Sequence, residues 1–364
     1  MPCSERSAWS RLAGQTRAWL IAAEPLPDRL TSPEIGADMR RRDFITLLGG
    51  AAATWSVAGR AQQVGRVWRV GSLSPASSGQ NDNFKAFMQA LGDLGYIDGK
   101  NIRFERRVAD GNLDHLPALA AELVGSNVDL ILAESSFAVQ AAQTATKTIP
   151  IVMTGVGNPV GSGFVKSISQ PGGNITGLTN DSIKVSSKYL EFLHAAIPDL
   201  MHVGVLIDPK HPNHPTVLKQ VQRTAHTIGT TISAVELPSV TDIDTALRLI
   251  QQERLDALVV PPDPTFAIIY HRIAEFAITN RLPTMFGQRR GVEAGGLMSY
   301  EPNLTDMYKR AAAMVDRILK GAKPADLPVE FPTRFQFTIN LKTAKVLGLT
   351  LPPALLTGAD ALIE

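Results

Sequence analysis

The sequence predicts a two-domain α/β protein built from two parallel sheets, each covered by helices on both faces. Its 364 residues correspond to two domains at about 100–200 residues per domain. Short apolar strands alternate with amphipathic helices, and the alternation runs in two blocks of comparable size. Strands of nearly continuous apolar character are typical of a parallel sheet that is buried on both faces.

The first block runs from residue 67 to about residue 154. Its predicted strands are residues 67–73, 102–108, 128–133 and 149–154. Its predicted helices contain residues 84–94, 116–123 and 137–147. In the first of these helices, Phe84, Phe87 and Leu91 recur at spacings of three and four, which places them on one buried face.

The second block begins after residue 178 and repeats the same alternation. We expect strands at residues 202–207, 231–237, 256–260, 283–287 and 296–300. We expect helices at residues 189–196, 217–228 and 243–252, and a further helix that Pro264 opens and that contains Ile273 and Phe276. The two blocks share no sequence identity, so the predicted repeat is one of architecture.

The C-terminal tail predicts a hinge between the two domains. It contains a helix at residues 306–319, a strand at 335–341 and a short helix at 342–347. A helix and a strand added after two complete blocks let the chain cross between domains more than once, and several crossings form a hinge. We expect one lobe to comprise residues 66–178 with 302–325, and the other to comprise residues 179–301 with 326–364.

The N-terminal segment, residues 1–61, has the pattern of an extension followed by an export signal. Three arginines at 40–42 precede an apolar stretch at 44–53, and the small residues around Ala61 suit a cleavage site. The run Arg41-Arg42-Asp43-Phe44-Ile45 fits the twin-arginine pattern, which directs export of a folded protein. We expect translation to start at Met39 and cleavage to follow Ala61, so that the periplasmic protein lacks Cys3; the alternative is an amphipathic cytosolic helix.

Composition excludes several classes of protein. The formal net charge of +2 lacks the basic excess of a nucleic-acid binder. A single cysteine excludes an internal disulfide, a cysteine-rich zinc site and a CxxC redox pair. The longest uncharged apolar run, at 44–59, has 16 residues, whereas a spanning helix needs about 20.

Candidate ligand-binding residues follow the predicted strands, because ligands of open parallel sheets bind beyond the carboxyl ends of the strands. The candidates are Ser74, Ser135, Ser136, Thr154, Gly155, Asp208, Asp263 and Gln288. Hydroxyls and helix-start N–H groups in the first block favour an anion, and the two aspartates in the second block favour a cation. A zwitterion held between the lobes matches both, although each Ser, Thr or Asp alone also suits a helix cap.

Other motifs give little support for catalysis or for a cofactor. The glycines at 155–161 lack the GxGxxG spacing, and the sequence contains neither GxxxxGK[ST] nor GxSxG, so no cofactor is expected. His211 and His214 beside Asp208 could form a metal site, but a solvated turn is the favoured interpretation and no metal is expected. We expect Arg289 and Arg290 to lie on a solvated face.

Several phrases of the sequence resemble the ABC-transporter substrate-binding proteins of the tryptophan/tyrosine type. They are the leader, PGGNITG at 171–177, GLMSY at 296–300, RILKGAKPADLPVE at 317–330 and INLKTAKVLGL at 339–349. The resemblance covers about residues 40–364. It implies a type I periplasmic binding fold, which has two Rossmann-like lobes joined by a multi-segment hinge. It also implies delivery of a solute to an ABC permease and its ATPase at the inner membrane, and we expect the chain to be a monomer.

The resemblance also implies roles for individual residues. Ser135, Ser136 and Thr154 would hold a ligand carboxylate, and Asp263, with Asp208 as second choice, would hold its amine. The ligand side chain would meet Phe137, Phe266 or Tyr300. The leading hypothesis is therefore a non-catalytic periplasmic receptor for a small amino-acid-like ligand, including an aromatic one. The alternatives are a sugar or nucleoside receptor on the same fold, an exported metal-dependent hydrolase using His211, His214 and Asp208, and a cytosolic sensor domain.

Overall fold

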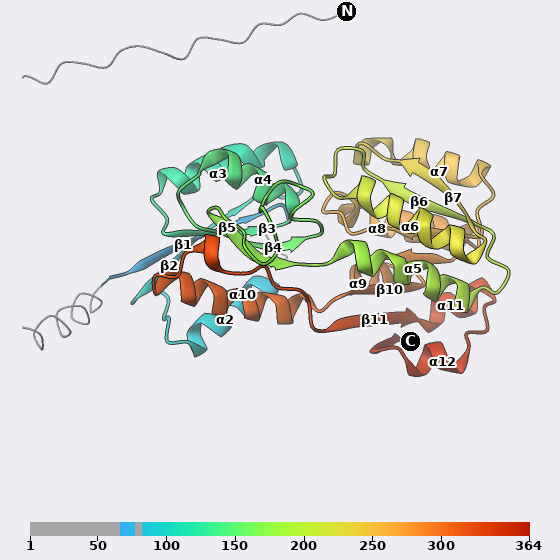
Figure 1. The fold of residues 1–364 in the computed structure, drawn as a ribbon. Coiled ribbons are helices and arrows are strands. Elements are labelled where there is room, and N and C mark those ends of the chain that lie inside the picture. The colour runs from blue at the N-terminus through green and yellow to red at the C-terminus, as the bar shows by residue number, and fades with distance from the viewer. Residues whose placement is uncertain (1–65, 77–81) are drawn as a thin grey trace, which may run out of the picture. The chain divides into compact units, whose positions relative to one another are not determined.

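The computed structural model describes residues 66–76 and 82–364 (Figure 1). The predicted export signal, with Met39, the twin arginines and the cleavage site at Ala61, lies outside the described residues. Residues 64–364 belong to one structural unit, which contains two β-sheets. None of the helices formed by the described residues is long and apolar enough to cross a bilayer.

The first sheet is wholly parallel and has the strand order β2-β1-β3-β4-β5. Its strands are β1 (Trp68–Ser74), β2 (Ile102–Val108), β3 (Leu130–Glu134), β4 (Ile151–Val156) and β5 (Ile175–Thr179). Four helices pack on it: α2 (Asp82–Asp93), α3 (Leu116–Gly125), α4 (Ser136–Ala145) and α10 (Leu304–Leu319). Two separate apolar clusters form, one with α3 and α4 and the other with α2 and α10, so this sheet is covered on both faces. We call it, with its helices, the first lobe.

The second sheet has the strand order β12-β11-β10-β9-β8-β6-β7. Its strands are β6 (His202–Ile207), β7 (Thr231–Glu236), β8 (Ala257–Val260), β9 (Thr284–Phe286), β10 (Met298–Pro302), β11 (Phe335–Asn340) and β12 (Ala361–Ile363). Its helices are α5 (Ser182–Ala196), α6 (His214–Ile228), α7 (Ile243–Gln252), α8 (Tyr270–Thr279), α9 (Arg289–Glu293), α11 (Leu341–Leu347) and α12 (Pro353–Thr357). This sheet with these helices is the second lobe, and it too has two apolar clusters.

One pair of strands in the second lobe departs from the predicted parallel arrangement. Strand β11 is antiparallel to β10, whereas the other pairings in that sheet are parallel. The chain leaves β10, forms α10 in the first lobe and then returns, as Figure 1 shows. Because it re-enters the second sheet from the side of the first lobe, β11 runs opposite to β10.

The chain passes between the lobes three times, near residues 180, 303 and 331–334. Two of these passages lie side by side, since the backbone N–H of Asn303 donates to the carbonyl of Arg334 at 2.9 Å. The segment after residue 325 stays with the first lobe longer than expected. Leu327 and Val329 are buried in its core, and the N–H of Val329 donates to Ile168. This segment follows the edge strand β5 before it crosses.

The helix expected to open at Pro264 is also different. A short 3₁₀ helix, Phe266–Ile268, precedes α8, which begins at Tyr270. The cause is local, because the Asp263 carboxylate accepts the N–H groups of Thr265 and Phe266 and holds this loop in a tight turn. The other predicted elements form, with starts and ends that differ by a few residues from those predicted.

Candidate functional site

A cavity of about 400 Å³ lies between the two lobes, at the carboxyl ends of strands in both sheets. Of the eight predicted ligand-binding residues, seven line it: Ser74, Ser135, Ser136, Thr154, Gly155, Asp263 and Gln288. Asp208 does not line the cavity, and its prediction as a ligand-binding residue needs correction. Its carboxylate turns back to accept the N–H of Lys210, and its own N–H donates to His214, so it lies behind the cavity wall.

The first lobe presents the start of helix α4 to the cavity. Ser135 caps this helix by accepting the N–H of Ala138 at 3.3 Å, as the capping alternative predicts. Its φ of +132° is a strained conformation for a residue with a side chain, and such strain is concentrated at ligand sites. Gly155 adopts φ +70° in the neighbouring wall. Together with the partial positive charge of a helix start, this wall suits an anionic group.

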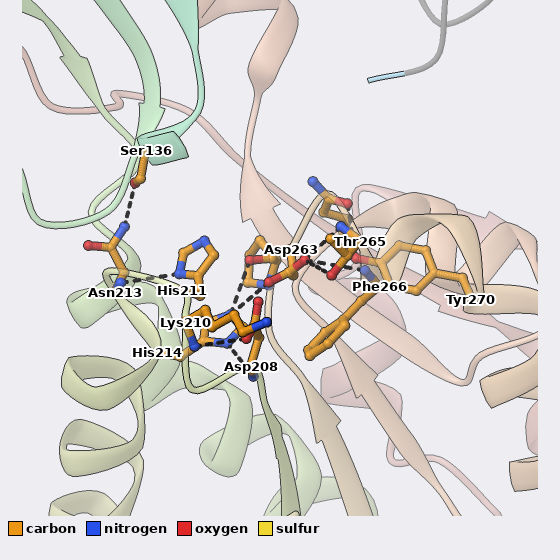
Figure 2. A network of polar contacts seen from close by, with 12 residues as sticks. Ser136, Asp208, Lys210, His211, Asn213, His214, Asp263, Thr265, Phe266 and Tyr270 are labelled. Carbon is orange, nitrogen blue, oxygen red and sulfur yellow. Dashed lines mark hydrogen bonds and ion pairs between the residues drawn. The ribbon is translucent and has the colours of Figure 1, made fainter. Parts of the chain in front are cut away.

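The second lobe presents a buried carboxylate, Asp263, which is 1% exposed (Figure 2). Its Oδ1 accepts hydrogen bonds from Thr265 and from the N–H of Phe266. Its Oδ2 accepts no hydrogen bond within the described part of the chain and lies 3.8 Å from Nε2 of His214. A buried carboxylate oxygen without a donor is costly, so this geometry suits a cationic group of a ligand.

Two buried histidines stack next to Asp263, with ring centroids 4.1 Å apart (Figure 2). Burial lowers the pKa of His214 and lowers that of His211 well below the ordinary value, so both rings are neutral at pH 7. Nδ1 of His214 accepts the N–H of Asp208, and Nδ1 of His211 accepts the N–H of Asn213. The proton of each neutral ring is therefore on Nε2.

This protonation decides whether the histidines can hold a metal. Ligand atoms of His211, His214 and Asp263 lie within 4.8 Å of one another, which resembles a three-ligand site. A metal-binding histidine normally donates its other ring N–H to an acceptor. Here each Nδ1 accepts a backbone N–H. If Nε2 bound a metal, the ring proton would move to Nδ1, and this new N–H would point at the backbone N–H. The hydrogen bonds of the two rings therefore disfavour a metal ion at these three residues.

Six charged residues line the cavity that the predicted site does not include: Asp82, Glu134, Arg289, Arg290, Glu293 and Glu301. The arginines were expected on a solvated face. Arg290 is exposed and Arg289 is half-buried, and both also line the cavity because α9 starts directly after β9 at its edge. Glu134 ends β3 and Glu301 lies in β10. Acids thus occur on both lobes, and the two arginines of the wall lie on the second lobe, so the predicted division into an anion-binding and a cation-binding lobe is incomplete. Applying the strand-end rule to every charged residue identifies Glu134, Arg289 and Arg290 but not Glu301.

Two of the additional acids, Glu134 and Glu301, are desolvated by the surrounding protein. Burial raises the pKa of Glu134, although Ser72 Oγ and Tyr308 Oη donate hydrogen bonds to its carboxylate at 2.6 and 2.8 Å. Burial raises the pKa of Glu301 to about 7. The hydrogen bond from the N–H of Arg289 and the nearby charge of Arg290 both lower this pKa, and burial outweighs them. A cation brought next to either carboxylate would favour its ionised form.

The three aromatic residues expected around the ligand side chain do not line the cavity. Phe137 packs edge-on against His211 at 5.0 Å, and Phe266 is fully buried in the core of the second lobe. Tyr300 stacks on Phe335 at 5.5 Å. Among the described residues, the cavity wall contains only two benzenoid rings, those of Phe84 and Tyr308.

Asn213 joins the two lobes beside the cavity (Figure 2). Its Nδ2 donates to Ser136 Oγ at 2.8 Å, and its Oδ1 accepts from Ser162 Oγ at 3.3 Å. Both serines belong to the first lobe, whereas Asn213 precedes α6 in the second. The contact between Phe137 and His211 lies on the same side. These contacts stabilise the arrangement in which the lobes face each other closely.

Replacing Asn213 by alanine is therefore expected to favour separated lobes and to weaken ligand binding by about three- to tenfold, the equivalent of one buried hydrogen bond. The dissociation constant and the radius of gyration from X-ray scattering would measure the two effects. Gln251→Ala, at an exposed position of α7, is the matched control. Unchanged affinity and unchanged scattering would show that this contact does not hold the lobes together.

The fold and the interlobe cavity define a two-lobed receptor for a small molecule, and comparison with known proteins identifies the family. Residues 77–363 match the family model described as ABC transporter substrate binding protein, and the chain belongs to that family. The "Tyrosine-binding protein" of Clostridioides difficile (strain R20291) is 28% identical over 265 residues, covering 73% of this chain and 76% of that protein.

Solved structures agree with this assignment. The ABC domain from Streptococcus pneumonia in complex with L-Trp is 27% identical, covers 81% of this chain and 99% of its own, and superposes with a TM-score of 0.76. A conserved domain protein from Vibrio cholerae is also 27% identical, with the same coverage and a TM-score of 0.77. A leucine-binding protein from Thermotoga maritima, 13% identical over 77% of this chain and 87% of its own, has a TM-score of 0.55 and shows the fold alone. The predicted type I periplasmic binding fold and the substrate-binding function in an ABC transporter are thus confirmed.

Proposed function

We propose that this substrate-binding protein captures an amino-acid-like zwitterion between its two lobes. The observation that carries the proposal is the buried Oδ2 of Asp263, which lacks a hydrogen-bond donor among the described residues and lines the cavity with the start of α4. The ligand ammonium group would pair with Asp263. The ligand carboxylate would accept hydrogen bonds at Ser135, Ser136 and Thr154. One relative is named for binding tyrosine and another was solved with L-Trp, which supports an amino acid as the ligand.

Binding would close the lobes because only a closed form contacts the ligand from both sides. The difference in contact energy shifts the population toward that form. Micromolar affinity corresponds to about −8 kcal/mol. Several charge-assisted hydrogen bonds at about 1.5–3 kcal/mol each supply this amount before the cost of ordering the ligand is subtracted.

The protein would then deliver its ligand, chemically unchanged, to a permease and its ATPase in the inner membrane. The neutral histidine pair supports a binding role, since both Nδ1 atoms are occupied by backbone donors and neither ring is placed to shuttle a proton through that atom. The proposal requires no cofactor, metal or nucleic acid, and a monomer suffices because the two lobes of one chain enclose the cavity.

The location and the chain organisation belong to the same proposal. The twin-arginine pattern at Arg41 and Arg42 and the small residues before Gln62 support export to the periplasm and cleavage after Ala61. The lobes would comprise residues 66–178 with 302–325, and 179–301 with 326–364. Burial of Leu327 and Val329 in the first lobe favours moving the last boundary to about residue 331.

A thermal-shift screen of the full chain tests the proposal. The panel contains the common amino acids, their decarboxylated and deaminated analogues, sugars and nucleosides. We expect an amino acid to raise the unfolding temperature, because a ligand at 100 times its Kd stabilises the folded state by about 2.7 kcal/mol. We expect analogues that lack either charged group to have little effect. If only sugars or nucleosides raised the unfolding temperature, the ligand would belong to that class and would not be a zwitterion.

A further inference from the structure

The ionisable groups of the cavity wall are not balanced. Within the described residues, the wall contains five acids: Asp82, Glu134, Asp263, Glu293 and Glu301. It contains two arginines, Arg289 and Arg290, and the two histidines are neutral. Two of the acids form exposed pairs at the rim, Asp82 with Lys85 at 3.3 Å and Glu293 with Arg289 at 2.8 Å. Of the three acids left, Asp263 and Glu301 are buried and Glu134 is half-buried. The five acids of the wall thus outnumber its two arginines.

Glu301 is the acid on the same lobe as Asp263. Its side chain is 8% exposed, and its Oε1 accepts the N–H of Arg289 at 2.7 Å. Burying a carboxylate without full pairing costs free energy. The wall of the second lobe therefore has two buried carboxylates, Asp263 and Glu301, and Oδ2 of Asp263 has no hydrogen-bond donor among the described residues.

The distance between these two carboxylates follows from the sheet. Asp263 comes after β8 and Glu301 lies in β10, and β9 separates the two strands. Two strand spacings of about 4.8 Å place them roughly 10 Å apart across the sheet. The four-carbon stem of a lysine-like side chain, with a hydrogen bond of about 2.8 Å at each end, bridges a gap of this order.

The rest of the wall is poorly suited to an aromatic side chain. Phe84 is 5% exposed and packs against Phe87 and Phe104, and the hydroxyl of Tyr308 donates to Glu134. Neither ring is free to offer a stacking face. A further polar group, Ser182 Oγ, is buried in the wall without a hydrogen-bond partner among the described residues. The wall thus favours a ligand side chain that donates hydrogen bonds.

We propose that the ligand is a basic amino acid, with its α-ammonium group on Asp263 and its side-chain ammonium or guanidinium group on Glu301. This rests on the proposed function and goes beyond it, because it assigns a positive charge to the ligand side chain. Glu134 adds negative potential from the first lobe. The relatives named for tyrosine and tryptophan would then differ from this chain in the ligand side chain that they accept.

Calorimetric titration of the full chain with L-lysine, L-arginine, L-norleucine, L-tryptophan and L-tyrosine tests this proposal. Norleucine is lysine without its side-chain amine. We expect lysine or arginine to bind at least tenfold more tightly than the other three. In Glu301→Gln, the advantage of lysine over norleucine should fall to about one, whereas Glu275→Gln, at an exposed position of α8, should retain it.

The outcomes separate this inference from the proposed function. If tryptophan or tyrosine bound more tightly than lysine and arginine, the ligand would not have a basic side chain. The proposed function as an amino-acid receptor would still hold. Binding of none of the five, with sugars or nucleosides bound instead, would overturn both. A lysine preference that survives in a folded Glu301→Gln variant would overturn the role of Glu301.

Discussion

Replacing Asp263 by asparagine is expected to weaken the binding of an amine-bearing ligand by at least tenfold and up to about a hundredfold. A charge-assisted hydrogen bond to a buried carboxylate contributes about 1.5–3 kcal/mol, and each 1.4 kcal/mol is a factor of ten. Asparagine keeps an oxygen that accepts from Thr265 and Phe266, so the loop conformation is preserved. Alanine should weaken binding at least as much, but it also removes those contacts.

Calorimetric titration with the best ligand from the screen measures the effect. Asp199→Asn is the matched control, since Asp199 is exposed on the same lobe and precedes β6 at the amino edge of the sheet. The control should bind as the unmodified chain does. Equal affinity of Asp263→Asn and the unmodified chain would remove Asp263 from the binding site and, with it, the argument for a ligand amine.

Replacing Glu301 by glutamine is expected to stabilise the protein by about 3 kcal/mol at pH 8. Burial raises the pKa of Glu301 from 4.5 to about 7. Between these values the folded protein keeps a proton that the unfolded chain has lost, so the unmodified chain loses stability as the pH rises through this window. Glutamine does not titrate, so the variant does not lose this stability. The difference between a pKa of 4.5 and one of about 7 corresponds to about 3 kcal/mol of unfolding free energy.

Chemical denaturation at pH 5 and pH 8 measures this difference, which should be largest at pH 8. The ionisable groups facing Glu301 are Arg289, Arg290 and Glu293 from α9, Tyr270 from α8 and Tyr189 from α5. A variant with the same stability as the unmodified chain at both pH values would show that Glu301 is not desolvated.

The same carboxylate thus has opposite effects on stability and on binding. Retaining a buried carboxylate in the cavity wall lowers stability at neutral pH, and such a loss is common where function requires the group. A ligand cation next to Glu301 would lower its pKa and recover part of the lost stability. Glu301→Gln is therefore expected to be more stable and less selective.

The fold could be predicted from the sequence because its signals are local. Phe84, Phe87 and Leu91 have helical spacing, and strands such as β8 are short apolar runs bounded by polar residues. The direction of β11 could not be predicted in the same way. It depends on which lobe the chain leaves and re-enters, and this is a property of the whole topology.

The site could be predicted only in part, for a related reason. The strand-end rule fixes the sheet edge at which a residue lies, and it correctly placed Asp263 and Ser135 at the cavity. It does not fix the direction of a side chain, and Asp208 turns back onto its own loop. Glu301 lies within β10 instead of following it, so the strand-end rule does not find it. Arg289 and Arg290 had no signal that distinguished them from solvated arginines.

The central claim is that one zwitterion is bound by both lobes, with its ammonium group on Asp263. A crystal structure of the full chain with its best amino-acid ligand tests this most directly. The account predicts the ligand in the interlobe cavity, with its α-nitrogen about 2.8 Å from Asp263 Oδ2 and its carboxylate at the start of α4. A ligand bound by one lobe only, or one whose α-nitrogen lies away from Asp263, would contradict it.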